Sequence, residues 1–222
     1  MTTVAIMARA PVAGRCKTRL GKEIGFEQAA SLYEAMLRDR IEAVDAITEA
    51  RRIVLVAPED DGVRALGEMV RAPWQVWAQQ GEDLGARLSH GFRSLLATAP
   101  PGELVCIVDS DSPLAPLGRA VDAARASTAD VVLGTCDDGG YYLIGMRSLH
   151  EAALIDIPWS TSEVTRATHE RGRALGFRVE DVAPSWDVDT RADVLRLARV
   201  ASDLDLPRLT RAWIERHREA LS

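Results

Sequence analysis

The stretch LVCIVDSDSP, residues Leu104–Pro113, decides the predicted fold. Its first five residues are apolar, which predicts a short strand buried on both faces. Two aspartates, Asp109 and Asp111, follow at the carboxyl end of that strand, where open α/β sheets bind ligands. Alternate residues of an extended segment point to the same side. Both carboxylates can therefore face one target, and that target must be positive because two unpaired carboxylates repel.

The composition limits the classes of function. The chain has 222 residues, 47% of them apolar, and a formal net charge of -6. This length and apolar share are enough for one full hydrophobic core. A negative net charge argues against a chain-wide nucleic-acid surface, because binding the phosphate backbone needs a clustered positive face. We therefore expect no nucleic-acid partner.

The cysteines and the apolar runs indicate the compartment. Cys16, Cys106 and Cys136 lack the paired spacing of a zinc site or a disulfide framework. Such cysteines are typical of reduced thiols in the cytoplasm. The apolar run before Arg9 is too short for a signal sequence, and no stretch reaches the length of a membrane span. We expect a cytoplasmic protein with no membrane partner.

Predicted strands and helices alternate along the chain. This alternation predicts an α/β fold with a single three-layer, doubly wound, mostly parallel mixed sheet, in one domain over residues 1–222. The C-terminal helices, within 191–220, are expected to pack on the core or against a second subunit of a homodimer. Apolar runs predict strands at 3–7, 52–57, 74–78, 104–108, 130–134, after Gly140 and at 177–182. Helical periodicity predicts helices at 26–47 and 60–69, a helix that opens within 80–87 and runs to about 96, and helices at 117–126, 160–175, 191–203 and from 207 onward.

A basic loop, ARAPVAGRCKTRLGKEIG, follows the first strand. It holds Arg15, Lys17 and Arg19 beside glycine and threonine, a composition that suits a backbone wrapped around an anion. It is not a Walker A loop, because Cys16 stands where that motif requires glycine before the lysine. A solvated surface cluster is the alternative. The position after the first strand of an α/β chain favours phosphate binding.

Two further stretches are ambiguous when each is taken alone. In DDGGYYLIG, Asp138 and the glycines can approach a ligand, but Asp-Gly turn chemistry also predicts a plain hairpin. In WDVDT, Asp187 and Asp189 repeat the spacing of the first aspartate pair, but one of them can simply cap the following helix. If the strand order reverses beside the LVCIV strand, the basic loop and the first pair flank one crevice.

Five motifs, which together span nearly the whole chain, carry a resemblance: PVAGRCKTRL, QGEDLGARL, VDSDSP, DDGGYYLIG and WDVDT. As a set they resemble the small bacterial GT-A-type glycosyltransferases associated with radical-SAM, selenium-domain and arsenosugar gene neighbourhoods. That family is similar in turn to the guanylyltransferases of deazaflavin-cofactor synthesis and to other nucleotide-diphospho-sugar transferase folds. Each motif is weak singly, and the combination is specific.

The resemblance implies roles for particular residues. Mg²⁺ or Mn²⁺ would be held by Asp111 and an aspartate of WDVDT, preferably Asp189, with Asp109 as a further ligand. Position 109 is usually glycine in the related pattern, and Thr135-Cys136 replaces a Pro-Ala pair on the acceptor side. Nucleotide binding is expected of Pro11, Gly14, Arg15, Lys17, Thr18, Arg19, Gly85 and Arg87, and acceptor binding of Asp138, Gly139, Gly140 and Tyr141.

The expected activity is transfer from a nucleotide-activated donor to a small acceptor. Lys17 and Arg19, with the metal, would stabilise charge on the leaving phosphate, and Asp138 would accept a proton from the attacking hydroxyl. The family resemblance favours a nucleotide sugar and hence glycosyl transfer. The strongly basic loop suits a nucleoside triphosphate, which would make the protein a nucleotidyltransferase acting on a small phosphorylated acid or sugar phosphate.

Two other classes fit less well. A haloacid-dehalogenase-like phosphatase also uses Asp-x-Asp, but there the pair ends the first strand, whereas three predicted strands precede Asp109 here. A non-catalytic nucleotide-binding module would keep the basic loop without the motif carboxylates. Phosphorylation of Asp109 would reverse this ranking in favour of the phosphatase.

Overall fold

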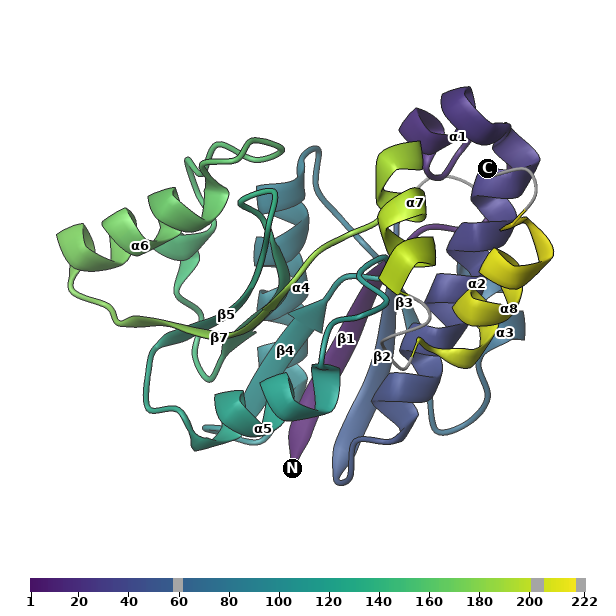
Figure 1. The fold of residues 1–222 in the computed structure, drawn as a ribbon. Coiled ribbons are helices and arrows are strands. Elements are labelled where there is room, and N and C mark those ends of the chain that lie inside the picture. Colours follow the sequence, from purple (N-terminus) through teal and green to yellow (C-terminus); the bar gives the residue numbers. More distant parts are fainter. Residues whose placement is uncertain (58–61, 201–205, 219–222) are drawn as a thin grey trace.

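A computed structural model describes residues 1–57, 62–200 and 206–218. Seven strands form one sheet in the order β3-β2-β1-β4-β6-β5-β7 (Figure 1). Strand β6 runs antiparallel to both neighbours, and the other paired strands are parallel. The predicted mostly parallel mixed sheet is confirmed. The strands are β1 (Thr2–Ala8), β2 (Ala50–Val56), β3 (Gln75–Ala78), β4 (Leu104–Val108), β5 (Val131–Cys136), β6 (Tyr141–Met146) and β7 (Val179–Ser185).

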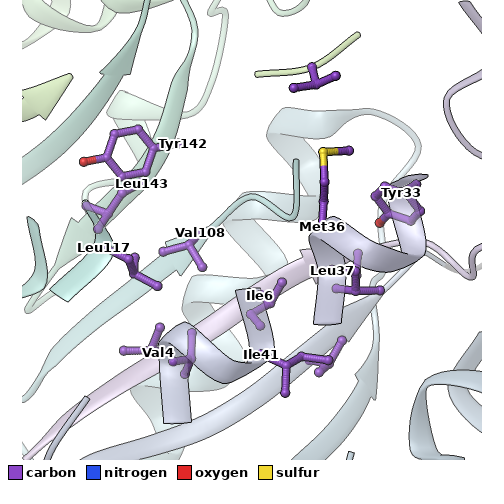
Figure 2. Close-up of a cluster of buried hydrophobic side chains, with 14 of the residues drawn as sticks. Val4, Ile6, Tyr33, Met36, Leu37, Ile41, Val108, Leu117, Tyr142 and Leu143 are labelled. Carbon is purple, nitrogen blue, oxygen red and sulfur yellow. The ribbon is translucent and has the colours of Figure 1, made fainter. Parts of the chain in front are cut away.

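Helices cover both faces of the sheet, which gives the three predicted layers. Alternate strand residues, such as Ile6 and Val108, meet α2, α5, α7 and α8 in one hydrophobic cluster (Figure 2). The other strand residues pack on α4 and η1 in a second cluster. The helices are α1 (Thr18–Ile24), α2 (Phe26–Asp45), α3 (Gly62–Met69), α4 (Leu84–Thr98), α5 (Leu117–Ala126), η1 (Glu151–Ala153), α6 (Val164–Leu175), α7 (Arg191–Val200) and α8 (Arg208–Arg216).

Two predictions of local structure were wrong. The stretch 18–24, interpreted as part of a loop, forms α1, a seven-residue helix with no side-chain cap at its start. The sequence from Ser160 to Glu163 has the spacing of a capping box, which predicts a helix start at Ser160. The box does not form, because α6 begins only at Val164 and Ser160 has a φ of 63°. The ends of two predicted helices, at residues 60–61 and 201–203, lie outside the described residues.

Turns, helix caps and cysteines bear on points that the sequence left open. The chain between β5 and β6 makes a hairpin, with Gly139 at its turn in a left-handed conformation (φ 89°). Thr190 and Asp193 cap α7 reciprocally: the Asp193 carboxylate accepts from Thr190 N at 2.8 Å, and Asp193 N donates to Thr190 Oγ1 at 3.3 Å. All three cysteines are free. In the described part of the chain, no helix combines the length and apolarity that a membrane crossing requires.

The last helix, α8, is held on α2 by a buried carboxylate. Asp39 of α2 accepts hydrogen bonds from Leu209 N, Thr210 N and Thr210 Oγ1 at 3.0, 2.7 and 2.6 Å. Asp39 is only 5% exposed. The two helices lie side by side (Figure 1), so the contact of α8 with the core is established. A contact with a second subunit stays a prediction.

We expect Asp39→Ala to lower the free energy of unfolding by about 2 kcal/mol, because it leaves buried donors at the start of α8 without an acceptor. Urea unfolding followed by circular dichroism measures this change. Asp45→Ala on the same helix is a matched control, since the Asp45 side chain is half exposed. Equal losses in the two variants would show that the carboxylate does not anchor α8.

Candidate active site

A cavity of about 450 Å³ opens at the carboxyl ends of β1 and β4. The sheet order places these two strands side by side, so the loop after β1 and the aspartates after β4 meet at one edge. The cavity is lined by the end of β1, the basic loop, the start of α4, the aspartates after β4, the start of β6 and Asp189. The predicted crevice between the basic loop and the aspartates is present.

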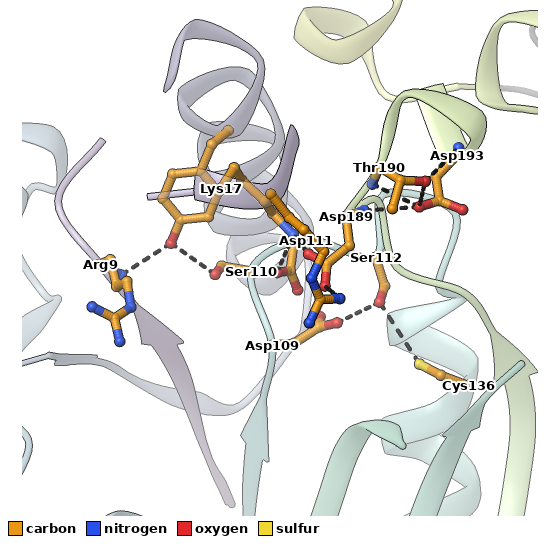
Figure 3. Close-up of polar contacts among 12 residues, drawn as sticks. Arg9, Lys17, Asp109, Ser110, Asp111, Ser112, Cys136, Asp189, Thr190 and Asp193 are labelled. Atoms are coloured by element: carbon orange, nitrogen blue, oxygen red, sulfur yellow. Dashed lines mark hydrogen bonds and ion pairs between the residues drawn. The ribbon is translucent and has the colours of Figure 1, made fainter. Parts of the chain in front are cut away.

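Lys17 lies at the centre of this site (Figure 3). Its Nζ donates to Asp111 Oδ2 at 2.6 Å and to Asp189 Oδ1 at 2.5 Å. The side chain is only 5% exposed. Burial alone would lower the pKa of Lys17, but the two carboxylates hold that pKa well above its usual value. The amine is therefore a permanent positive charge between two motifs that are far apart in the sequence.

Asp111 and Asp109 differ sharply in their surroundings. Burial tends to raise the pKa of Asp111, but the charge and hydrogen bond of Lys17 lower it below its usual range. Asp109 instead accepts from Arg40 Nη2 at 2.9 Å and from the hydroxyl of Ser112 (Figure 3), which engages both of its oxygens. Burial raises the pKa of Asp109 to about 8, although Arg40 opposes the shift. Asp111 is thus the carboxylate that faces the cavity centre as an anion.

The WDVDT motif supplies Asp189 through the start of α7. Asp193 accepts from the backbone N–H of Asp189 at 3.1 Å. Because Asp193 caps the helix, the Asp189 carboxylate is not needed as a cap and bonds Lys17 instead. Asp187 lies close by, and burial, followed by repulsion from Asp111 and Asp189, raises its pKa to about 6. The sequence pattern had already paired Asp187 with Asp189, but only the fold shows that both lie beside Asp111.

A hydrogen-bond chain fixes the edge of the cavity. The hydroxyl of Tyr33 on α2 accepts from the backbone of Arg9 at 3.0 Å and shares a hydrogen bond with Ser110 Oγ at 2.9 Å. Burial raises the pKa of Tyr33 to about 12, so this hydroxyl stays protonated. The chain ties the start of the basic loop to the aspartate loop. Tyr33 lies in the helix that periodicity predicted at 26–47, and nothing in its spacing indicates this contact with the two loops.

The remaining predicted nucleotide-binding residues divide into two groups. Thr18, Arg19 and Arg87 line the cavity with Lys17, whereas Pro11, Gly14, Arg15 and Gly85 are not among its lining residues. Gly85 is needed for packing and not for the cavity: a Cβ at this position would lie 2.5 Å from Trp159 Nε1 and 2.7 Å from Leu154 O. This glycine allows α4 to pack closely against the segment before α6.

The predicted acceptor residues lie at the β5-β6 hairpin. Asp138 is exposed and accepts from Gly140 N at 2.9 Å. Tyr141 lines the cavity, and its buried hydroxyl has no hydrogen-bond partner among the residues that the structure describes. Its ring meets Trp159 edge to face, with centroids 5.9 Å apart. Of this group, therefore, Tyr141 lines the cavity, while Asp138, Gly139 and Gly140 are not among its lining residues.

The two carboxylates have the ligand chemistry that a divalent cation requires. Asp111 and Asp189 each place one oxygen within hydrogen-bond distance of the same nitrogen, so their oxygens converge on one cation position. Across the described residues, no three His, Cys, Asp or Glu side chains form a ready-made metal cluster. Mg²⁺ does not require one, since one or two carboxylates plus substrate phosphates commonly hold it.

Solved structures share this fold. A structure from Desulfovibrio desulfuricans G20, provisionally described as a nucleotide-diphospho-sugar transferase, is 27% identical, with a TM-score of 0.89 over 100% of this chain and 97% of that one. A 4-diphosphocytidyl-2C-methyl-D-erythritol synthase is 17% identical (TM-score 0.55, 88% and 97% covered). The inositol-1-phosphate CTP transferase from T. maritima is 14% identical (TM-score 0.54, 87% and 91% covered). No curated protein matches the chain.

Fold and site together define the class: the transferases with the nucleotide-diphospho-sugar transferase fold, which include glycosyltransferases and nucleotidyltransferases. This confirms the class predicted from the five motifs. Residues 40–161 match the family described as "Uncharacterized protein conserved in bacteria (DUF2064)", and the chain belongs to that family. The matched region includes Asp109, Asp111 and the hairpin, while the basic loop and WDVDT lie outside it.

Proposed function

We propose that this protein is a metal-dependent glycosyltransferase that moves a sugar from a nucleotide sugar to a small acceptor. The observation that carries the proposal is the convergence of the basic loop, the end of β4 and WDVDT on the amine of Lys17 inside one cavity. The similarity to a structure described as a nucleotide-diphospho-sugar transferase, at a TM-score of 0.89, favours sugar transfer.

The basic residues would bind the diphosphate of the donor. Lys17 and Arg19 lie on the same side of the cavity, and the Arg19 guanidinium is 3.6 Å from Asp189 and 75% exposed. An exposed guanidinium can turn toward a phosphate and bind it with two parallel hydrogen bonds. Both cations then stabilise the negative charge that develops on the leaving phosphate oxygen. Arg87 lies on the α4 side of the same cavity.

Asp111 and Asp189 would hold Mg²⁺ or Mn²⁺ against the donor phosphates. When bound, such a cation neutralises charge on the leaving diphosphate. Asp109 contributes indirectly, since Arg40 and Ser112 engage its oxygens and fix the loop that carries Asp111. We propose it as a positioning residue and a less suitable ligand than Asp111.

Two aspartates are candidates to accept the proton of the attacking hydroxyl. Asp138 was predicted for this role, and its charge lies close enough to contribute to the raised pKa of Asp187. A general base works best when its pKa is near the working pH, and Asp187, with a pKa of about 6, meets that condition. We therefore propose Asp138 as the acceptor-side base and Asp187, which lies beside Asp111 and Asp189, as a second candidate.

Nucleotidyl transfer is the second candidate, favoured by one observation: three basic residues, Arg15, Lys17 and Arg19, stand within five positions of the phosphate-side loop. A triphosphate carries more charge than a diphosphate and would use them more fully. The likeness to two cytidylyltransferase structures shows the shared fold.

Calorimetric titration with a panel of nucleotide sugars and nucleoside triphosphates tests the proposal, with and without Mg²⁺ or Mn²⁺. We expect at least one nucleotide sugar to bind, and to bind ten times more tightly or better with metal. A preference for a nucleoside triphosphate over every nucleotide sugar would favour nucleotidyl transfer. Absence of metal-dependent binding across the panel would contradict the proposed function.

A further inference from the structure

The structure already holds a cation at the position where the two carboxylates converge. The amine of Lys17 lies 2.6 Å from one oxygen of Asp111 and 2.5 Å from one oxygen of Asp189. A metal ion that used the same two oxygens would lie within about 3 Å of that amine, where two positive charges repel strongly. Lys17 and a divalent metal therefore exclude each other at this position.

The charges around Lys17 make it a strong competitor. Asp187 lies beside Asp111 and Asp189 and adds to the negative charge around the amine. Two neighbouring arginines are engaged differently: Arg40 pairs with Asp109 at 2.9 Å, and Arg19 is 3.6 Å from Asp189 and mostly exposed. Removing the charge of Lys17 would leave the converging oxygens of Asp111 and Asp189 without the cation between them. One or two carboxylates of this kind are a usual protein contribution to a divalent-cation site.

The backbone conformation of Lys17 indicates that the hydrogen bonds of its side chain hold this residue in place. With φ 44° and ψ 46°, Lys17 adopts the left-handed conformation at the start of α1. The left-handed conformation costs free energy for a residue with a Cβ, so a residue keeps it only where surrounding interactions compensate for that cost. Here those interactions include the two hydrogen bonds of its amine. If a stronger acceptor drew the amine away from these two carboxylates, the backbone of Lys17 could therefore leave the left-handed conformation.

We propose that Lys17 is a built-in counter-ion that occupies the Asp111–Asp189 site until a phosphate-bearing ligand draws its amine away, so that a divalent metal binds together with phosphate and not before it. The inference rests on the metal-dependent function proposed above and adds an order of events to it. A phosphate group offers the displaced amine a doubly charged acceptor within the same cavity. Metal alone offers the amine no new partner.

Water-proton relaxation enhancement with Mn²⁺ tests the inference, because it reports Mn²⁺ bound to the slowly tumbling protein and not to a small complex. Inorganic pyrophosphate serves as a phosphate probe independent of base and sugar. We expect the wild-type protein to give enhancement with Mn²⁺ and pyrophosphate together, and little with Mn²⁺ alone. Lys17→Met is expected to bind Mn²⁺ alone with a dissociation constant at least ten times lower than that of the wild type.

Three variants sharpen the comparison. Lys22→Met removes one exposed charge from the same helix and should behave as wild type. Lys17→Arg keeps the charge and should not gain metal binding. Lys17→Gln repeats the test if Lys17→Met does not fold, as judged by circular dichroism.

The outcomes separate this inference from the proposed function. If the wild-type protein binds Mn²⁺ alone as tightly as Lys17→Met, or if neither Lys17→Met nor Lys17→Gln gains affinity, the counter-ion role is wrong while metal-dependent transfer stands. If the wild-type protein binds no Mn²⁺ with pyrophosphate or with any nucleotide of the panel, the proposed function itself fails.

Discussion

Asp111→Asn is expected to abolish metal-dependent nucleotide binding and to lower turnover by about 10²–10³-fold, the size of effect seen when one charge-stabilising group is removed from an active site. The substitution keeps the shape of the side chain and removes its charge. It takes away one of the two carboxylates that converge on the amine of Lys17. Calorimetry with the best-binding donor, with and without Mg²⁺, measures the change.

Asp122→Asn is a matched control for this experiment. Asp122 lies on α5, its side chain is 72% exposed, and it forms an i,i+3 ion pair with Arg125. Such exposed pairs contribute little to stability, so metal dependence should be unchanged. If Asp111→Asn retained the full effect of metal on donor binding, Asp111 would not be a metal ligand and the assignment of the site would have to change.

Arg40→Met is expected to cause the largest loss of stability, about 3 kcal/mol, because it leaves a buried acidic group without its partner. The Arg40 side chain is only 4% exposed and donates to Asp109 at 2.9 Å and to Ser112 O at 2.7 Å. Methionine fills a similar volume and offers no donor. Urea unfolding of the variant and the wild type measures the difference.

The size of this loss should depend on pH in a defined direction. In the folded wild-type protein the pKa of Asp109 is raised to about 8 by burial, whereas in the unfolded chain it is about 4. Near pH 6 the group is mostly neutral when folded and needs Arg40 least. As the pH rises through the folded pKa the carboxylate must be buried as an anion, so the loss in Arg40→Met should grow between about pH 6 and pH 9.

The double variant Arg40→Met/Asp109→Asn isolates the pair. It should recover part of the stability lost in Arg40→Met and remove the growth of that loss with pH, because a neutral amide takes the place of the acid. A loss that is equal at both pH values would show that Arg40 acts through its hydrogen bond to Ser112 O and not through the charge of Asp109.

The sequence predicted well which strands and loops form the site, because these elements depend on local patterns. Short apolar runs located the strands, and β4 spans the five residues that were expected. Residues at the carboxyl ends of neighbouring parallel strands must meet, so the crevice followed from the strand order. Helix α1 was not predicted, because it is short, has no side-chain cap and follows a residue in a left-handed conformation.

The partners of the charged residues could not be predicted, because they depend on the tertiary fold. Arg40 appeared only as one of the charged residues of a core-packing helix, and nothing in its spacing pointed to Asp109, 69 positions away. Gly85 was interpreted as a nucleotide-binding residue because of its motif, whereas the structure places it against Trp159. In WDVDT the spacing alone did not tell which of the two aspartates caps the helix and which faces the site. In the structure Asp193 caps the helix, which leaves the carboxylate of Asp189 to bind Lys17.

The separation of Lys17 and Asp189 by 172 positions has a consequence for the synthesis of the protein. The basic loop is synthesised well before WDVDT, so a nascent chain that ends after β4 still lacks one of the two carboxylates that meet Lys17. An unfinished chain could hold phosphate loosely through the basic loop but could not hold metal with it. The proposed cation site is therefore complete only after Asp189 has been synthesised, and we expect a product truncated before Asp189 to lack metal-dependent binding.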